Sequence, residues 1–422
     1  MIVVLIGLRV PIGLALAMVA FFGLWGIVGL DIALSLLSIL PYDFAASWEL
    51  SAVPMFLLMG TLAHRSGMTA SLFTAARLWL GGLPGGLAVA TNFACAGFAA
   101  ASGSSLATTF AVGKIAIPEM LRYRYDLSLA TSVVACAGTL GIMIPPSVIM
   151  VIYGVFAEVS IAALFIGGVI PGLLTAAIYA AMIIGRCTLQ PALAPPLRER
   201  PSWRERWLAL LDVWPLPLLV IGVIGSIYGG IATPTEAGAV GSFLAILIAL
   251  GRGQMSWAVL RDSARETLLS TGAIFFVAIG AILLTRFMAF SGVPAFMADF
   301  MKQWAIGEVH VIVVMAIIYI ILGCFLDPIG IILLTLPVML PIFTALNIDL
   351  IWIGILVTKF IEIGLITPPV GLNVYAIKVM MPEIALGTIF AGSMWFLACE
   401  VVIVTLMIAF PELSLYLPRL MQ

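Results

Sequence analysis

The segment AASGSSLATTF places a group of oxygen-bearing side chains within an apolar region. The hydroxyls belong to Ser102, Ser104, Ser105, Thr108 and Thr109. Gly103 lets the chain reverse tightly between them. Hydroxyl and carbonyl oxygens at an interrupted helix are typical ligands of a coupling cation. Serines and small residues also let membrane helices pack closely, so the segment alone leaves both interpretations open.

Two pairs of adjacent prolines are the second candidate feature. Pro145-Pro146 lies in LGIMIPPS, and Pro368-Pro369 lies in IGLITPPV. Proline removes a backbone donor and clashes with the preceding turn, so the carbonyl groups just before each pair lose their helical partners. One proline kink is frequent in membrane helices. Two kinks in matching contexts favour carbonyl groups that bind a cation.

Ionisable residues within apolar segments complete the set. Asp327 in GCFLDPIG is a candidate for an ion site because an unpaired charge in lipid is costly, but Asp before Pro also begins helices. Lys359 and Glu362 lie three residues apart, which predicts an ion pair on one helix. Lys114 and Arg286 either attract an anion or extend toward an interface.

The composition fixes the class of protein that must position these residues. The chain has 422 residues, of which 63% are hydrophobic and 9% charged, and its mean hydropathy is +1.24. Soluble domains carry about 25% charged residues, so this is a membrane protein. A net charge of −1 gives no basic face for a nucleic acid. The five cysteines are scattered singly, which argues against a disulfide framework or a zinc site.

Apolar stretches of about 20 residues predict a bundle of membrane helices. We expect spans or interrupted spans at 1–30, 48–64, 84–118, 128–158, 161–185, 213–229, 233–250, 268–290, 307–343, 350–380 and 384–410. The amphipathic pieces at 69–80 and 293–304 are expected to lie along the membrane surface. The loop at 186–212 is rich in arginine, which predicts that it is cytoplasmic.

The second half of the chain repeats the first. A constant shift of 223 positions superposes Pro145 on Pro368 and Ser104 on Asp327. The same shift matches Phe73 with Phe296, Pro118 with Pro341, Asp126 with Asp349, Leu127 with Leu350, Gly141 with Gly364, Val151 with Val374 and Ile161 with Ile384. We therefore expect two re-entrant hairpins, 84–118 and 307–343, and two broken helices, 128–158 and 350–380.

The number of crossings predicts how the two repeats are oriented. Five crossings separate the hairpins, and an odd number makes the repeats inverted. The first hairpin then opens toward the cytoplasm and the second toward the periplasm. The predicted organisation is a first repeat at 1–212, a connecting span at 213–232 and a second repeat at 233–422.

Six segments, in this order, resemble the large membrane subunit of TRAP (tripartite ATP-independent periplasmic) transporters. They are GSSLATTFAVGKIAIPEM, LGIMIPPSVIMVIYG, FIGGVIPG, ATPTEAGAVG, FLDPIGIILLTLPVMLP and GLITPPVGLNVYAIK, and they cover nearly the whole chain. The resemblance implies an all-α, multi-pass protein of the bacterial inner membrane with an elevator-type transport domain. It also implies import of organic acids, such as C4-dicarboxylates or sialic acids, driven by Na⁺. The expected partners are a small four-helix membrane subunit and a periplasmic substrate-binding protein.

The resemblance also implies roles for individual residues. One sodium site would involve Ser102, Gly103, Ser104, Gly138, Gly141 and Pro145. The other would involve Gly323, Asp327, Gly364, Thr367 and Pro368. Contacts to the substrate would come from Ser104, Ser105, Ser147 and Asn373. Lys359 departs from the family pattern, in which a neutral polar residue is expected.

Other functions are weighed against this one. A stand-alone divalent-anion/sodium symporter would share the architecture, but the Ser-Asn-Thr expected at its hairpin tips is absent from this sequence. An intramembrane enzyme would need a nucleophile and a base, or metal ligands, on facing segments, and no His is paired in that way in the sequence. A channel subunit would not require two inverted hairpins.

Overall fold

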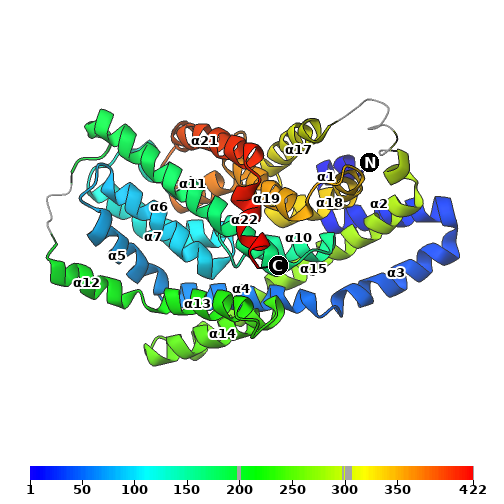
Figure 1. The fold of residues 1–422 in the computed structure, drawn as a ribbon, viewed down its shortest axis with the longest axis horizontal. Coiled ribbons are helices and arrows are strands. Elements are labelled where there is room, and N and C mark those ends of the chain that lie inside the picture. Colours follow the sequence, from blue (N-terminus) through cyan, green and yellow to red (C-terminus); the bar gives the residue numbers. More distant parts are fainter. Residues whose placement is uncertain (197–200, 297–298, 300–306, 422) are drawn as a thin grey trace.

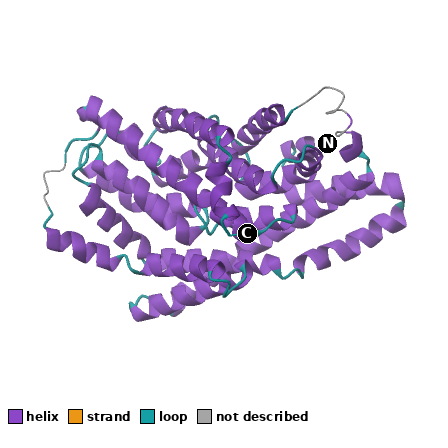
Figure 2. Ribbon diagram, viewed as in Figure 1, coloured by secondary structure: helices purple, strands orange, loops and turns teal. Residues whose placement is uncertain are grey.

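The computed structural model describes residues 1–196, 201–296, 299 and 307–421. The described residues form helices and no strand (Figure 2). The helices of the first half are α1 Ile2–Gly7, α2 Ile12–Val28, α3 Leu30–Ala45, α4 Ala52–Arg65, α5 Met68–Leu80, α6 Gly86–Ser102, α7 Ser105–Arg122, α8 Leu127–Ala137, α9 Leu140–Met143, α10 Val148–Ala157, α11 Ile161–Leu189 and α12 Trp203–Asp212. Those of the second half are α13 Pro215–Tyr228, α14 Pro234–Gly251, α15 Trp257–Phe290, α17 Glu308–Gly323, α18 Pro328–Ala345, α19 Leu350–Ile366, α20 Leu372–Met380, α21 Leu386–Ala409 and α22 Glu412–Arg419.

The described chain spans a membrane several times. Five of its helices are long and apolar enough to cross a bilayer, or up to eight spans if each strongly bent pair counts as one. Large apolar side chains such as Phe22, Ile221 and Phe243 are exposed, as expected for surfaces that face lipid. The prediction of an all-α, multi-pass membrane protein is confirmed.

Both predicted hairpins and both predicted broken helices are present. The arms α6 and α7 form the first hairpin, and α17 and α18 form the second. The first broken helix comprises α8, α9 and α10, bent by 40° at Pro145-Pro146. The second comprises α19 and α20 and is interrupted at Thr367–Gly371. Figure 1 shows the first hairpin in the left half of the molecule and the second right of its centre, with α19 between them.

Helix caps repeat along with the helices. Asp126 caps α8, and Asp349 caps α19 at the position matched by the 223-residue shift. Ser104 and Asp327, a second matched pair, cap α7 and α18. Each side chain accepts a hydrogen bond from a free backbone N–H of the first turn. The repeat is therefore structural, while the orientation of each half relative to the membrane remains a prediction.

Several predicted boundaries were wrong. Residues 1–30 are not one span, because the chain breaks between α1 and α2. The helix α3 was not predicted, and it forms a 56° bent pair with the segment that contains α4. The charged loop at 186–212 is shorter than expected, because α11 runs to Leu189 and α12 fills 203–212. The span predicted at 268–290 begins earlier, at Trp257. Most of the surface piece at 293–304 lies outside the described residues.

Candidate functional site

The tip of the first hairpin is a tight reversal between two helices. The arm α6 ends at Ser102, Gly103 has a left-handed φ of 59°, and Ser104 begins α7 as its cap. Only glycine fits this place without strain, because a Cβ on Gly103 would also lie 2.8 Å from the carbonyl oxygen of Pro146. The tip is therefore shaped to seat against the first helix break.

Two more glycines on the broken helix allow this close approach. A Cβ on Gly141 would lie 2.4 Å from the carbonyl oxygen of Ser104, and one on Gly138 would lie 2.0 Å from Thr109 Oγ1. The backbone N–H of Val148 donates to the carbonyl oxygen of Gly103 at 3.4 Å. The six residues predicted for the first sodium site are therefore gathered in one place. Whether they bind sodium stays a prediction.

The hydroxyls of the tip lie within this contact. Ser102 Oγ and Thr108 Oγ1 are 2.7 Å apart, and Thr108 Oγ1 also donates to the carbonyl oxygen of Ser104 at 2.9 Å. Thr109 Oγ1 is buried and has no hydrogen-bond partner among the described residues. A buried polar atom without a partner is costly unless something binds it. The set of hydroxyl and carbonyl oxygens fits a small monovalent cation.

A cavity of about 450 Å³ opens beside the same tip. Ser102 and Ser104 line it from the hairpin, and His64, Arg65 and Lys114 also face it. Arg65 pairs with Glu266 at 2.7 Å, and His64 Nδ1 is buried without a hydrogen-bond partner among the described residues. Glu266 lines the cavity too, so Lys114 is its charged side chain without an ion pair among the described residues, and together with the N-terminal end of α7 it favours an anion.

The second hairpin meets the second break in a similar way. A Cβ on Gly323 would lie 2.7 Å from the Cα of Gly364, so these two glycines bring the helices into backbone contact. Gly371 N donates to the carbonyl oxygen of Cys324 at 3.3 Å, and the thiol of Cys324 contacts the carbonyl oxygen of Pro368 at 3.3 Å. The two breaks differ in exposure, because Pro145-Pro146 is buried and Pro368-Pro369 is exposed.

The remaining residues predicted for the second sodium site make local contacts. Asp327 is exposed, and its carboxylate accepts from the backbone N–H of Gly330 at 3.0 Å as the cap of α18. Thr367 Oγ1 donates to the carbonyl oxygen of Ile363 at 2.6 Å. The alternative interpretation of Asp327, a helix start, is therefore present in the structure. A role in sodium binding stays a prediction.

Of the four residues predicted to contact the substrate, only Ser104 lines the 450 Å³ cavity among its described residues. Ser105 donates to Asn373 Oδ1 at 2.8 Å, and Asn373 Nδ2 donates to the carbonyl oxygen of Ala135 at 3.0 Å. Ser147 donates to the carbonyl oxygen of Ile142 at 2.6 Å. Ser105, Ser147 and Asn373 are buried, so their hydrogen bonds are made within the protein.

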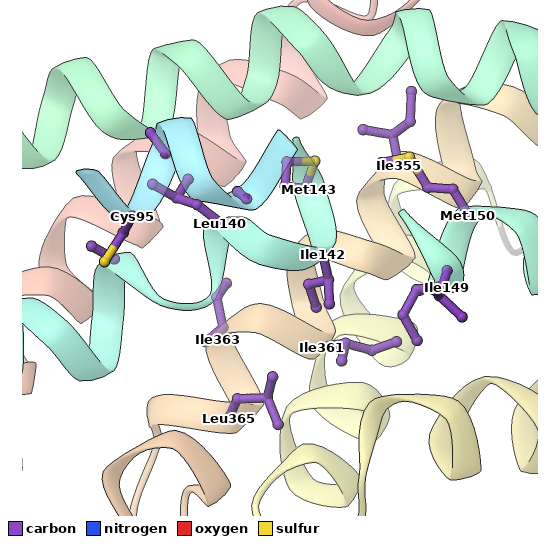
Figure 3. Close-up of a cluster of buried hydrophobic side chains, with 14 of the residues drawn as sticks. Cys95, Leu140, Ile142, Met143, Ile149, Met150, Ile355, Ile361, Ile363 and Leu365 are labelled. Carbon is purple, nitrogen blue, oxygen red and sulfur yellow. The ribbon is translucent and has the colours of Figure 1, made fainter. Parts of the chain in front are cut away.

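Apolar side chains surround the first break on the side of α19. Figure 3 shows Leu140, Ile142 and Met143 of the first broken helix near Ile361 and Ile363 of α19. All five belong to one buried cluster. Dry packing of this kind keeps water from the backbone of the break. The carbonyl groups before Pro145 were expected to lose their partners, but the carbonyl oxygens of Gly138, Thr139, Leu140 and Ile142 each accept a hydrogen bond.

A buried ionic cluster lies on α19, four residues before Ile363. Lys359 Nζ contacts Glu362 Oε2 at 2.6 Å, Glu400 Oε1 at 2.8 Å and Thr175 Oγ1 at 3.0 Å. Tyr179 also donates to Glu400. The ion pair of Lys359 with Glu362 is confirmed, but the sequence did not predict Glu400. Its one signal was a single acidic residue within the apolar helix α21.

A second and larger cavity, of about 820 Å³, lies beside α3, α10, α14 and α15. Its lining includes Arg286 together with Asp43, Glu49 and Glu158. Three acidic residues and one basic residue give it the opposite charge balance to the cavity at the hairpin tip. Arg286 therefore faces a cavity, but not the basic one.

Comparison with known proteins identifies the family. Residues 1–413 match the family described as tripartite ATP-independent periplasmic transporter, DctM component. The chain belongs to the DctM family. Because this family consists of transporter permeases, the DctM-family chain is a transporter subunit and not an enzyme.

Two DctM-family relatives and one solved structure show how far the similarity extends. A C4-dicarboxylate TRAP transporter large permease of Pseudomonas aeruginosa is 36% identical over 392 residues, covering 91% of this chain and 89% of the relative. A C4-dicarboxylate TRAP transporter large permease of Vibrio cholerae is 33% identical, covering 99% of this chain and 95% of the relative. The YdaH transporter of Alcanivorax borkumensis has a similar fold, with a TM-score of 0.60 at 16% identity, covering 90% of this chain and 89% of that structure.

Proposed function

We propose that this permease imports organic acids across the bacterial inner membrane by coupling them to sodium ions. The single observation that carries the proposal is the seating of the hairpin tip, Ser102–Ser104, against the first helix break beside a basic cavity. The tip brings oxygen atoms that suit Na⁺ next to a space that suits a carboxylate. An ion and an anion bound side by side partly neutralise each other, which lowers the cost of holding either within the membrane.

Each part of the site has a task in this proposal. The unpartnered hydroxyl of Thr109, with backbone carbonyl oxygens beside Pro145-Pro146, binds the cation. The N-terminal end of α7 and the side chain of Lys114 attract the carboxylate into the cavity. The matched break at Pro368 holds a second sodium ion in the same manner.

The cavity supports a moving-barrier mechanism. It lies between the first hairpin and two helices outside the hairpins, α4 and α15. Hairpins and broken helices that slide together against α4 and α15 would carry the ion and the substrate from one side of the membrane to the other. This is an elevator, in which the binding residues stay together while the surrounding helices stay in place.

The proposed partners follow from the family. A small four-helix membrane subunit would cover part of the exposed apolar surface in the lipid bilayer, and a periplasmic binding protein would deliver the acid. The proposed substrates are C4-dicarboxylates, sialic acids or similar carboxylates, in line with the C4-dicarboxylate permeases among the relatives. The basic lining of the 450 Å³ cavity supports an anionic substrate but does not select one acid.

Uptake by the purified transporter tests the proposal. The chain is reconstituted into liposomes with its small subunit, and a binding protein loaded with radiolabelled acid is added on one side. Uptake should require an inward sodium gradient and the binding protein. Uptake of the free acid without the binding protein would favour the stand-alone symporter. Uptake at the same rate with and without a sodium gradient would refute the proposed sodium coupling.

A further inference from the structure

The second half of each broken helix crosses into the other repeat. The helix α10 packs against α18 and α19, and α20 packs against α7 and α8. The two crossings correspond, because α7 matches α18 and α8 matches α19 in the repeat. Each crossing therefore places the chain that follows one break beside the hairpin of the other half.

The two crossings differ in chemistry. On α20, Asn373 accepts from Ser105 at 2.8 Å and donates to the carbonyl oxygen of Ala135 at 3.0 Å. The shift of 223 positions places Met150 of α10 at the matching position. Figure 3 shows Met150 near Ile355 of α19, within the apolar cluster. The Asn373 link thus has no counterpart at Met150, and the polar contact of the other crossing lies one turn later, where Tyr153 OH donates to the carbonyl oxygen of Leu350 at 2.7 Å.

The polar link is part of a path that joins both hairpin tips. Ser105 is the first residue of α7, directly after the tip of the first hairpin. Asn373 lies two residues after Gly371, whose N–H donates to the carbonyl oxygen of Cys324 at the second tip. The start of α20 therefore holds both tips at once. Separating them would leave buried donors and acceptors unpaired, which is costly where water cannot replace the partner.

We propose that Asn373 is a positioning residue that couples the two helix breaks, so that an ion bound at one break changes the affinity for an ion at the other. The inference rests on the proposed sodium coupling. In this inference Ser105 and Asn373 act through the hydrogen bond between them and do not contact the substrate. Neither residue is among the described lining of the 450 Å³ cavity, and both side chains are buried.

Three variants of the complete transporter in liposomes test this role. Ser105→Ala and Asn373→Leu remove the link, whereas Ser105→Thr keeps the hydroxyl. In the first two, sodium activation of uptake should become less steep, and the sodium concentration for half activation should rise about fivefold or more. The substrate KM at saturating sodium should not change in Ser105→Ala, and Ser105→Thr should restore steep activation. A raised substrate KM with unchanged steepness would overturn the proposal in favour of direct substrate contact.

A second measurement does not depend on sodium coupling. Amide hydrogen exchange is followed in sodium-free detergent at residues 103–107 and 371–376. Ser105→Ala should speed exchange in both segments, although only the first carries the substitution. Faster exchange confined to 103–107 would overturn the link. A wild-type transporter without sodium activation would overturn the proposed function, and the exchange result would still decide whether Asn373 joins the two tips.

Discussion

Thr109, beside the first predicted sodium site, carries a hydroxyl that lacks a hydrogen-bond partner among the described residues. This hydroxyl is buried and faces Gly138. Thr91, on the other arm of the hairpin, is equally buried, but its hydroxyl donates to the carbonyl oxygen of Leu87 at 2.7 Å. The two threonines differ in having a partner, which makes them a matched pair for a test.

Thr109→Val should weaken sodium activation of uptake, because valine keeps the shape of the side chain and removes one oxygen ligand. We expect the sodium concentration for half activation to rise roughly two- to tenfold, equivalent to about 0.5–1.5 kcal/mol for one lost contact. Initial uptake rates over a range of sodium concentrations measure this. Thr91→Val is the control and should leave sodium activation as in the wild type. Equal behaviour of the two variants would exclude Thr109 from the ion site.

Lys359 should matter for stability, because it pairs with two buried carboxylates at once. Lys359→Met leaves Glu362 and Glu400 without a counter-ion, and breaking a buried pair in this way costs about 3–5 kcal/mol. Thermal unfolding of the detergent-solubilised protein should show a large loss of stability. A triple variant that adds Glu362→Gln and Glu400→Gln removes the uncompensated charges and should recover most of it. A single variant as stable as the wild type would contradict this view of the cluster.

At the scale of elements, the start of α18 combines two tasks that substitution can separate. Asp327 caps the helix, and it is also a candidate ligand of the second ion. Asp327→Asn keeps a capping side chain and removes the charge, whereas Asp327→Ala removes both and costs about 1 kcal/mol of helix stability. Both variants should weaken the sodium dependence of uptake if the carboxylate binds the ion. Unchanged sodium activation in Asp327→Asn would show that Asp327 caps α18 and does not bind the ion.

The breaks were predictable from the sequence because glycine and proline mark them directly. Gly103 and the two Pro-Pro pairs ended helices where expected. Helix lengths were less predictable. The helix α3 was missed because Asp31, Pro41 and Asp43 interrupt its apolar pattern, although the structure tolerates Pro41 within the helix. The first turns of α15 were missed because their charged residues hid a continuous helix.

Contacts between distant segments could not be predicted in the same way. Whereas the grouping of the first predicted sodium site came from the family resemblance, the constant shift between repeats indicated which residues occupy equivalent places. It gave no signal for the bond between Ser105 and Asn373, which are 268 positions apart and occupy non-equivalent places. Glu400 was missed for the same reason, since its partner Lys359 lies on another helix.

At the scale of the whole molecule, the 450 Å³ cavity opens where the first hairpin meets α4 and α15, and Gly60 of α4 also packs against the backbone of Ser102 at the hairpin tip. An elevator requires these two surfaces to slide past each other, so a bridge across the cavity should stop transport. Ser270→Cys on α15 and Ala107→Cys on α7 place two thiols in the lining of the cavity, one on each of the two helices. The five native cysteines are buried, which leaves the new pair to react.

A short, cleavable thiol cross-linker applied to the double variant should abolish uptake, and cleavage should restore it. Each single variant treated with the same reagent should keep its activity. Uptake that continues in fully cross-linked protein would show that α7 does not move relative to α15, and the mechanism would then need a fixed barrier and local gates. Mass spectrometry of the digested protein measures the extent of cross-linking.

The exchange of α10 and α20 between the halves has a consequence for the ancestry of the fold. A chain with one repeat would leave uncovered the part of its hairpin that the half-helix of the other repeat contacts, and its own last half-helix would lack the packing partners it has here. Such a half-length protein would be stable only as a dimer of identical copies, in which the last half-helix of each copy packs against the hairpin of the other. Fusion of two gene copies would then have kept, within one chain, the exchange of half-helices that first joined two separate molecules.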